Sequence, residues 1–241
     1  TGYASEWLLG KIFLKPFKTN MKLFIDTADI EEAQRATALG VISGATTNPK
    51  LAAAAGPGNF AVRVKEILAC CPGPVSVEVV ADTVDAMLEE AAEYSALDPR
   101  IVVKIPMTLE GVEVIHKLEL ERDIRVNVTC MMNSTQALMA MIAGASYVSL
   151  FVGRINDLGN DSDSAISETA EFIERGGFAT SIIAGSIRQV GDISRAFLAG
   201  AHIVTIPYKF LPQMAHHPRT SETIQEFKEA WDEALRKGEL S

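Results

Sequence analysis

Cysteine is scarce in this sequence, and its spacing argues against structural metal or disulfide sites. The three cysteines are Cys70, Cys71 and Cys130; two are adjacent and none belongs to a CxxC pair. This arrangement excludes a disulfide framework and a four-cysteine zinc site. Because unpaired cysteines are typical of proteins from reducing compartments, we expect a cytoplasmic protein.

An excess of positive charge and long apolar runs are also absent. The 22 basic and 31 acidic residues give a net charge of −9, which argues against nucleic acid or an anionic membrane as a partner. No apolar run reaches the ~18 residues that a transmembrane helix needs.

The sequence contains no GxSxG and no Walker motif. Its histidines, His116, His202, His216 and His217, lack the spacing of metal ligands, so we expect no metal.

The chain is long and apolar enough to bury a large core. It has 241 residues, 48% of them hydrophobic, and a chain of this length buries about 70–75% of its unfolded surface.

The first twenty residues begin without Met and carry three lysines against one acid, Glu6. We interpret residues 1–20 as an N-terminal extension or a cloning remnant, with a targeting segment as the alternative, and residues 21–241 as one catalytic domain.

Eight short runs rich in β-branched residues alternate with segments that are apolar at helical spacing. Such repetition predicts parallel strands joined by right-handed crossovers, and eight units in about 190 residues fit a (β/α)8 barrel. A doubly wound open sheet is the alternative, but no GxGxxG loop follows a strand. The runs are 22–28, 41–47, 74–80, 101–107, 125–131, 147–153, 180–186 and 202–208.

Side-chain alternation places the polar residues of these runs on one face. Successive side chains of a strand point to opposite sides. In the fourth run, Val103 and Ile105 share one parity and Lys104 has the other. The apolar parity must face the helices, so the polar parity must face the barrel axis. The same argument, applied to five strands, brings together inside the barrel Asp26, Glu78, Lys104, Asn127, Thr129 and Ser149.

A lysine in the middle of a β-branched strand is the most informative of these residues. Burying an ammonium group without partners is strongly unfavourable, so the group tends to lose its proton. The neutral amine of Lys104 can then form a Schiff base with a carbonyl, and Asp26 and Glu78 can transfer the protons. The alternative is a structural Lys104–Glu78 ion pair, and each carboxylate alone is equally well explained as a structural acceptor.

Hydroxyl, amide and guanidinium groups complete the candidate site. Thr129, Asn127 and Ser149 can hold a water or a sugar hydroxyl, or can be ordinary inward polar residues. Arg154 and Arg188 follow the sixth and seventh strands, at the rim where barrel active sites lie. Two guanidinium groups suit one phosphate dianion; surface ion pairing is the alternative for each.

Seven motifs follow one another in an order that is typical of a known family. They are FIDTADIEE (24–32), GATTNPKL (44–51), VSVEV (75–79), VVKIPMT (102–108), NVTCM (127–131), SLFVGRI (149–155) and AGSIR (184–188). Together they span nearly all of 22–210, and they resemble the transaldolases, in particular the short subfamily that also contains fructose-6-phosphate aldolase. The resemblance implies a barrel enzyme without a cofactor, which converts sedoheptulose 7-phosphate and glyceraldehyde 3-phosphate into erythrose 4-phosphate and fructose 6-phosphate.

The resemblance also implies roles for single residues. It makes Lys104 the Schiff-base lysine and Asp26 the acid/base at the C4 hydroxyl. It makes Glu78 and Thr129 the residues that hold the catalytic water. Asn48 is implied to orient the substrate, although capping of the following helix is the alternative. The remaining implied substrate-binding residues, of which the two arginines bind phosphate, are Asn127, Ser149, Phe151, Arg154, Ser186 and Arg188.

Two positions separate the subgroups of this family. The aldolase branch is known for Gln where this chain has Glu78 and for Tyr where it has Phe151. Both positions therefore resemble transaldolase. Fructose-6-phosphate aldolase is the first alternative, and a non-catalytic barrel that binds sugar phosphates is the second.

A final helix over residues 221–237 follows the eighth unit, so the barrel does not need it for closure. Ile224, Phe227, Trp231 and Leu235 form one apolar stripe on it. The stripe covers either its own barrel or a neighbouring subunit. The resemblance favours exchange between subunits of a homo-oligomer, a pentamer or a decamer.

Overall fold

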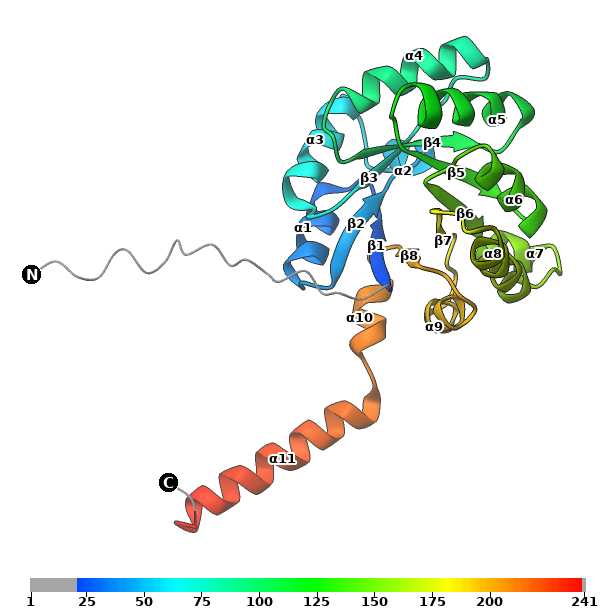
Figure 1. Cartoon of the computed structure of the whole chain (residues 1–241). Helices are drawn as coiled ribbons and strands as arrows, with labels where there is room; N and C mark the ends of the chain where they lie inside the picture. The colour runs from blue at the N-terminus through cyan, green and yellow to red at the C-terminus, as the bar shows by residue number, and fades with distance from the viewer. Residues whose placement is uncertain (1–20, 240–241) are drawn as a thin grey trace, which may run out of the picture.

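The computed structural model describes residues 21–239, so the interpretation of residues 1–20 falls outside them. Strands and helices alternate as the sequence predicts (Figure 1), and every strand lies within one of the eight predicted runs. The strands are β1 (Lys22–Asp26), β2 (Ile42–Thr46), β3 (Val75–Glu78), β4 (Ile101–Pro106), β5 (Val126–Met131), β6 (Tyr147–Phe151), β7 (Ser181–Gly185) and β8 (Ile203–Ile206).

The helices follow the strands, and several begin at an Asp, Asn or Thr whose side chain accepts an N–H of the first turn. Thr83 caps α4 and Asn133 caps α6 in this way. The helices are α1 (Ile30–Ala38), α2 (Pro49–Ala54), α3 (Phe60–Cys70), α4 (Val84–Ser95), α5 (Leu109–His116), the π-helix η1 (Lys117–Glu121), α6 (Ser134–Ile142), α7 (Val152–Asp157), α8 (Ser162–Gly176), α9 (Val190–Leu198), α10 (Phe210–Ala215) and α11 (Pro218–Arg236).

The eight strands form one closed barrel of parallel neighbours, from β1 to β8 and back to β1. Figure 1 shows the helices on the outside of this sheet. The closed order confirms the predicted (β/α)8 barrel and rules out the open sheet. Its register places Glu78 of β3 beside Lys104 of β4, and Lys104 beside Asn127 of β5.

The apolar core has two parts, as the alternation along the strands requires. Outward-facing residues such as Val77 and Val103 are buried against the helices. Inside the barrel, Phe24, Ile183 and Ile203 form a small separate cluster below the polar residues. Gly44 leaves space for this cluster, because a Cβ at position 44 would lie 2.4 Å from the Phe24 ring. The interior is therefore apolar at one end and polar at the other.

The last helix differs in position from the rest. It begins at Pro218, three residues before the predicted start, because His217 caps it and proline suits the first helical position. Figure 1 shows α11 extending away from the barrel. Its four predicted stripe residues are 43–71% exposed, so its own barrel does not cover them. None of the helices within residues 21–239 has both the length and the apolar composition of a membrane-spanning segment.

Candidate active site

A cavity of about 530 Å³ opens at the C-terminal ends of the barrel strands. Every strand contributes at least one residue to its wall, and barrel enzymes carry their active sites at this end. Of the residues predicted from the sequence, those in the wall are Asp26, Asn48, Glu78, Lys104, Ser149, Phe151, Arg154, Ser186 and Arg188.

A second hollow of about 390 Å³ lies on the outer surface, between α5 and α6. Its wall is largely apolar, with Val112, Met139 and Ile142 among its residues. It holds none of the candidate residues, so the cavity inside the barrel is the candidate active site.

Lys104 is buried in the wall of the cavity and paired with Glu78. Its Nζ lies 3.1 Å from Glu78 Oε2 and donates to the backbone carbonyl of Thr47 at 2.9 Å. The ion pair that the sequence offers as an alternative is therefore present. The ion pair is compatible with Schiff-base formation, because Glu78 is close enough to take a proton from the lysine and leave a neutral amine.

Asp26 lies at the end of β1 within a small network of hydroxyl groups. Thr46 Oγ1 donates to Asp26 Oδ1 at 2.7 Å, and the hydroxyls of Thr46 and Thr205 are 2.6 Å apart. Burial raises the pKa of the Asp26 carboxyl above its ordinary value, against the opposing effects of the Lys104 cation and the Thr46 hydrogen bond. A carboxylate with a raised pKa is a stronger base, which suits removal of a hydroxyl proton.

Asn127, Ser149 and Thr129 are buried polar residues next to these groups. Ser149 Oγ donates to Asn127 Oδ1 at 2.7 Å, and Asn127 Nδ2 donates to Ser76 Oγ at 3.1 Å. Asn127 is thus held behind the wall, while Ser149 faces the cavity. The Thr129 hydroxyl is buried and is not part of the cavity wall. It has no hydrogen-bond partner of good geometry within the described part of the chain, although the adjacent Cys130 thiol is close enough to interact with it. Buried hydroxyls in proteins normally bond to protein or ordered water, so Thr129 is suited to hold a water.

Arginines and loop residues form the outer end of the cavity. The Arg154 guanidinium lies 5.3 Å from the centre of the Phe151 ring, which fixes it by a cation–π contact. Arg188 Nη2 lies 3.1 Å from Asp157 Oδ2, and both side chains are more than half exposed. The surface ion pair considered for Arg188 is therefore present, and both arginines still border the cavity.

Asn48 combines the two roles that the sequence leaves open. Its side chain accepts the Leu51 N–H at 3.0 Å and caps α2, which begins with Pro49. The same residue lines the cavity. The cap fixes the Asn48 side chain at the mouth, where its amide can meet a substrate.

Three strand residues with a hydroxyl or thiol side chain in the wall, Thr46, Cys130 and Thr205, were missed by the sequence reasoning. Thr46 and Thr205 lie on strands to which the alternation argument was not applied, and their polar character among apolar neighbours is the signal that finds them. Cys130 has no such signal. Its φ of 62° shifts the register between Val128 and Met131, so its side chain reaches the cavity although simple alternation points it outward.

Comparison with known proteins places this barrel among enzymes. Residues 23–240 match the family model described as Transaldolase/Fructose-6-phosphate aldolase. The chain is 49% identical over 217 residues to a probable transaldolase of Pelotomaculum thermopropionicum, which covers 90% of this chain and all of the relative. It is 46% identical over 212 residues to a probable transaldolase of Oceanobacillus iheyensis, which covers 88% of this chain and 99% of the relative.

The chain belongs to the transaldolase/fructose-6-phosphate aldolase family. The family match spans every strand apart from Lys22 at the start of β1, and it includes the whole wall of the cavity. A third relative, a probable transaldolase of Desulforudis audaxviator, is 46% identical over 211 residues, 88% of this chain and 97% of its own. Membership of this enzyme family confirms the resemblance drawn from the seven motifs. Family membership alone does not assign a role to each residue of the cavity wall.

Proposed function

We propose that this protein is a transaldolase that moves a dihydroxyacetone unit from a ketose phosphate to an aldose phosphate through a Schiff base on Lys104. The observation that carries the proposal is the buried Lys104–Glu78 pair in a cavity that also contains Asp26 and two arginines. Donors of the expected class are sedoheptulose 7-phosphate and fructose 6-phosphate, and the reaction belongs to the pentose phosphate pathway.

The first half of the reaction forms the imine. Lys104 transfers a proton to Glu78, and its neutral amine attacks the ketone carbon of the donor. The carbinolamine loses water while Glu78 returns the proton, with Thr129 holding the water that shuttles it. Asn48, Asn127 and Ser149 orient the hydroxyls of the sugar chain.

The second half breaks and remakes a carbon–carbon bond. Asp26 removes the proton of the C4 hydroxyl, and the electrons of the C3–C4 bond move to the imine, which becomes an enamine. The aldose phosphate leaves, and the enamine attacks the aldehyde carbon of the acceptor, whose new hydroxyl takes the proton from Asp26. The imine accepts the electron pair itself, so the proposed reaction needs no metal or organic cofactor.

Trapping tests whether the barrel is an enzyme or only binds sugar phosphates. Incubation with fructose 6-phosphate and borohydride, followed by mass measurement of the intact protein, is expected to show a reduced three-carbon adduct. The three-carbon mass requires cleavage of the sugar as well as imine formation. An unchanged protein mass would favour the binding barrel, and a six-carbon adduct without any three-carbon adduct would show imine formation without cleavage.

Loss of either arginine is expected to weaken binding of phosphorylated substrates. A charge-assisted hydrogen bond contributes about 1.5–3 kcal/mol, so Arg154→Ala and Arg188→Ala are each expected to raise KM for fructose 6-phosphate roughly 10- to 150-fold. The larger effect is expected for Arg154, because Arg188 must exchange its Asp157 partner for phosphate.

Steady-state kinetics with dihydroxyacetone as an alternative donor provides the comparison, since this donor has no phosphate. Arg175→Ala on α8, an exposed arginine paired with Glu171, is the matched control and is expected to behave as wild type. Equal losses with both donors would instead assign the arginines a structural or directly catalytic role.

We also propose that residues 21–241 act as one catalytic domain in a cytoplasmic homo-oligomer, a pentamer or a decamer. Two observations support this. The three thiols are free, which suits a reducing compartment. The exposed stripe of Ile224, Phe227, Trp231 and Leu235 on α11 is suited to cover a neighbouring subunit.

Deleting residues 219–241 is expected to give smaller particles in light scattering, because it removes the apolar stripe. The Schiff-base lysine is expected to remain trappable, since the barrel closes without α11. An unchanged particle size after the deletion would show that α11 does not hold the subunits together.

A further inference from the structure

The loop between β7 and α9 carries Ser186 and Arg188, and it is held in a strained conformation. Ser186 has a φ of 57°, in the left-handed region that non-glycine residues rarely adopt. Such conformations persist only where the surrounding contacts enforce them. The loop must therefore be fixed from outside.

One side of the loop is fixed by the start of α7. The Gly153 N–H donates to the Ser186 carbonyl at 3.0 Å. A Cβ on Gly153 would lie 2.4 Å from that carbonyl and 2.5 Å from Arg188 Cγ. Only glycine lets the two segments approach this closely.

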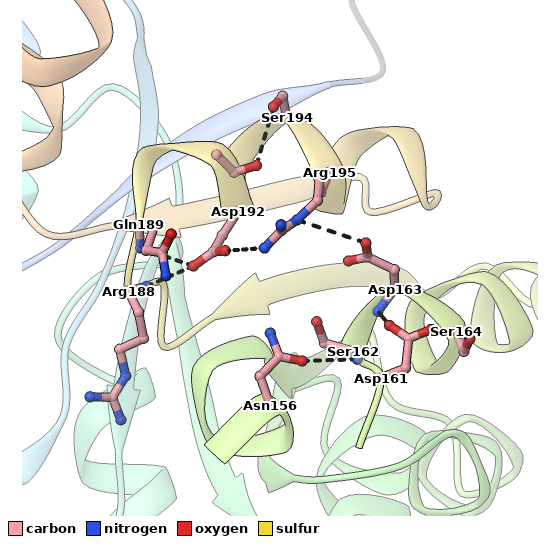
Figure 2. Close-up of polar contacts among 11 residues, drawn as sticks. Asn156, Asp161, Ser162, Asp163, Ser164, Arg188, Gln189, Asp192, Ser194 and Arg195 are labelled. Carbon is pink, nitrogen blue, oxygen red and sulfur yellow. Dashed lines mark hydrogen bonds and ion pairs between the residues drawn. The ribbon is translucent and has the colours of Figure 1, made fainter. Parts of the chain in front are cut away.

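The other side of the loop is fixed by the Asp192 carboxylate, as Figure 2 shows. Asp192 Oδ2 accepts the backbone N–H of Arg188 at 3.0 Å and that of Gln189 at 2.9 Å. The side chain is only 4% exposed although it is charged. The contact with the Gln189 N–H completes the capping box of α9. The contact with the Arg188 N–H lies one residue beyond that box, so the same carboxylate also holds the arginine that borders the cavity.

Arg195 balances the charge of Asp192 and connects it to the neighbouring helix. Its Nη2 lies 2.5 Å from Asp192 Oδ1, and its Nε lies 3.8 Å from Asp163 Oδ2 at the start of α8 (Figure 2). A buried carboxylate is costly unless it is paired. Asp192 is therefore paired with Arg195 through one carboxylate oxygen while the other accepts the two N–H groups of the loop.

We propose that Asp192 is a positioning residue for the phosphate end of the site, acting through the backbone of Arg188. Its carboxylate fixes the direction in which the Arg188 side chain leaves the loop, and so the place where a phosphate is bound. The inference rests on the proposed function in that Arg188 binds phosphate. Asp192 itself contacts no reacting atom.

Asp192→Ala is expected to raise KM for fructose 6-phosphate roughly 10-fold, with kcat and the use of dihydroxyacetone unchanged. The effect must stay below that of Arg188→Ala, because a positioning residue can remove no more than the contact it positions. Asp192→Asn is expected to restore part of the affinity, since its amide oxygen can still accept both N–H groups while its amide nitrogen cannot accept from Arg195. In the Arg188→Ala background, Asp192→Ala is expected to raise KM for fructose 6-phosphate by a much smaller factor than it does in the wild-type protein.

Ser194→Ala is the matched control, because Ser194 (Figure 2) lies on the same helix and, among residues 21–239, its side chain donates to the Gly191 carbonyl and not to the loop. Borohydride trapping of dihydroxyacetone on Lys104 shows that each variant is folded. An unchanged KM for fructose 6-phosphate in Asp192→Ala would overturn the proposal, as would equal losses with both donors. If the wild-type protein shows no preference for the phosphorylated donor, the assignment of the phosphate site in the proposed function is wrong. That outcome is distinguishable from failure of the positioning role of Asp192.

Discussion

Lys104→Met is expected to abolish the borohydride-dependent mass gain and to reduce transfer activity below detection. Methionine has nearly the length of lysine and fills the same buried space, but it has no amine to attack a ketone. Intact-protein mass spectrometry after incubation with fructose 6-phosphate measures the first effect, and a coupled assay measures the second. A mass gain that persists in the variant would place the Schiff base on another lysine.

Lys50→Met is the matched control for this experiment. Lys50 also lines the cavity, but it lies on α2, and within the described residues the ion pair of Glu78 is made with Lys104. Trapping is expected to persist in this variant. Because methionine at position 104 leaves Glu78 buried without its partner, the double variant Lys104→Met with Glu78→Gln separates loss of the nucleophile from loss of stability.

Asp26→Asn is expected to lower kcat by about 10²- to 10⁴-fold, the usual contribution of a positioned acid/base group. Asparagine keeps the shape and can still accept the Thr46 hydrogen bond, but it cannot take the C4 hydroxyl proton. Trapping of dihydroxyacetone is expected to continue, since no carbon–carbon bond breaks in that step. Loss of this trapping would give Asp26 a role in imine formation instead.

Asp29→Asn offers a control within the same motif. Asp29 caps α1 by accepting the Glu32 N–H and lies outside the cavity wall. Its amide variant keeps a capping oxygen, so kcat is expected to remain near that of wild type.

The pH profile of the wild-type enzyme reports the same carboxylate. Burial raises the pKa of Asp26, and the base form is present only above that pKa. kcat/KM is therefore expected to fall, as pH decreases, at a higher pH than an ordinary aspartate would cause. A profile that stays flat down to the ordinary aspartate range would argue against Asp26 as the base.

Alternation along the strands was sufficient to bring the central residues together. Parity alone predicted that six residues share one interior: Asp26, Glu78, Lys104, Asn127, Thr129 and Ser149. Four of them line the cavity, whereas Asn127 and Thr129 are fully buried and are not part of its wall. The prediction succeeded because regular strands in a closed barrel allow only two directions for a side chain. The same argument on β2 and β8 would have found Thr46 and Thr205.

Features that depend on irregular backbone or on distant partners could not be predicted in this way. The left-handed φ of Cys130 turns its side chain into the cavity. The Arg188–Asp157 pair joins the loop between β7 and α9 to the last residue of α7. Asp192 is recognisable in the sequence only as a helix-start carboxylate, and its hold on the Arg188 backbone becomes visible when the loop is folded.

The fate of the dihydroxyacetone unit is the most direct test of the proposed transfer. Fructose 6-phosphate labelled in its first three carbons is incubated with the protein and unlabelled erythrose 4-phosphate, and the products are followed by mass spectrometry. We predict that the label appears in a seven-carbon ketose phosphate and that little free dihydroxyacetone is released. Release of labelled dihydroxyacetone at the same rate with or without the acceptor would contradict transfer and make the protein an aldolase.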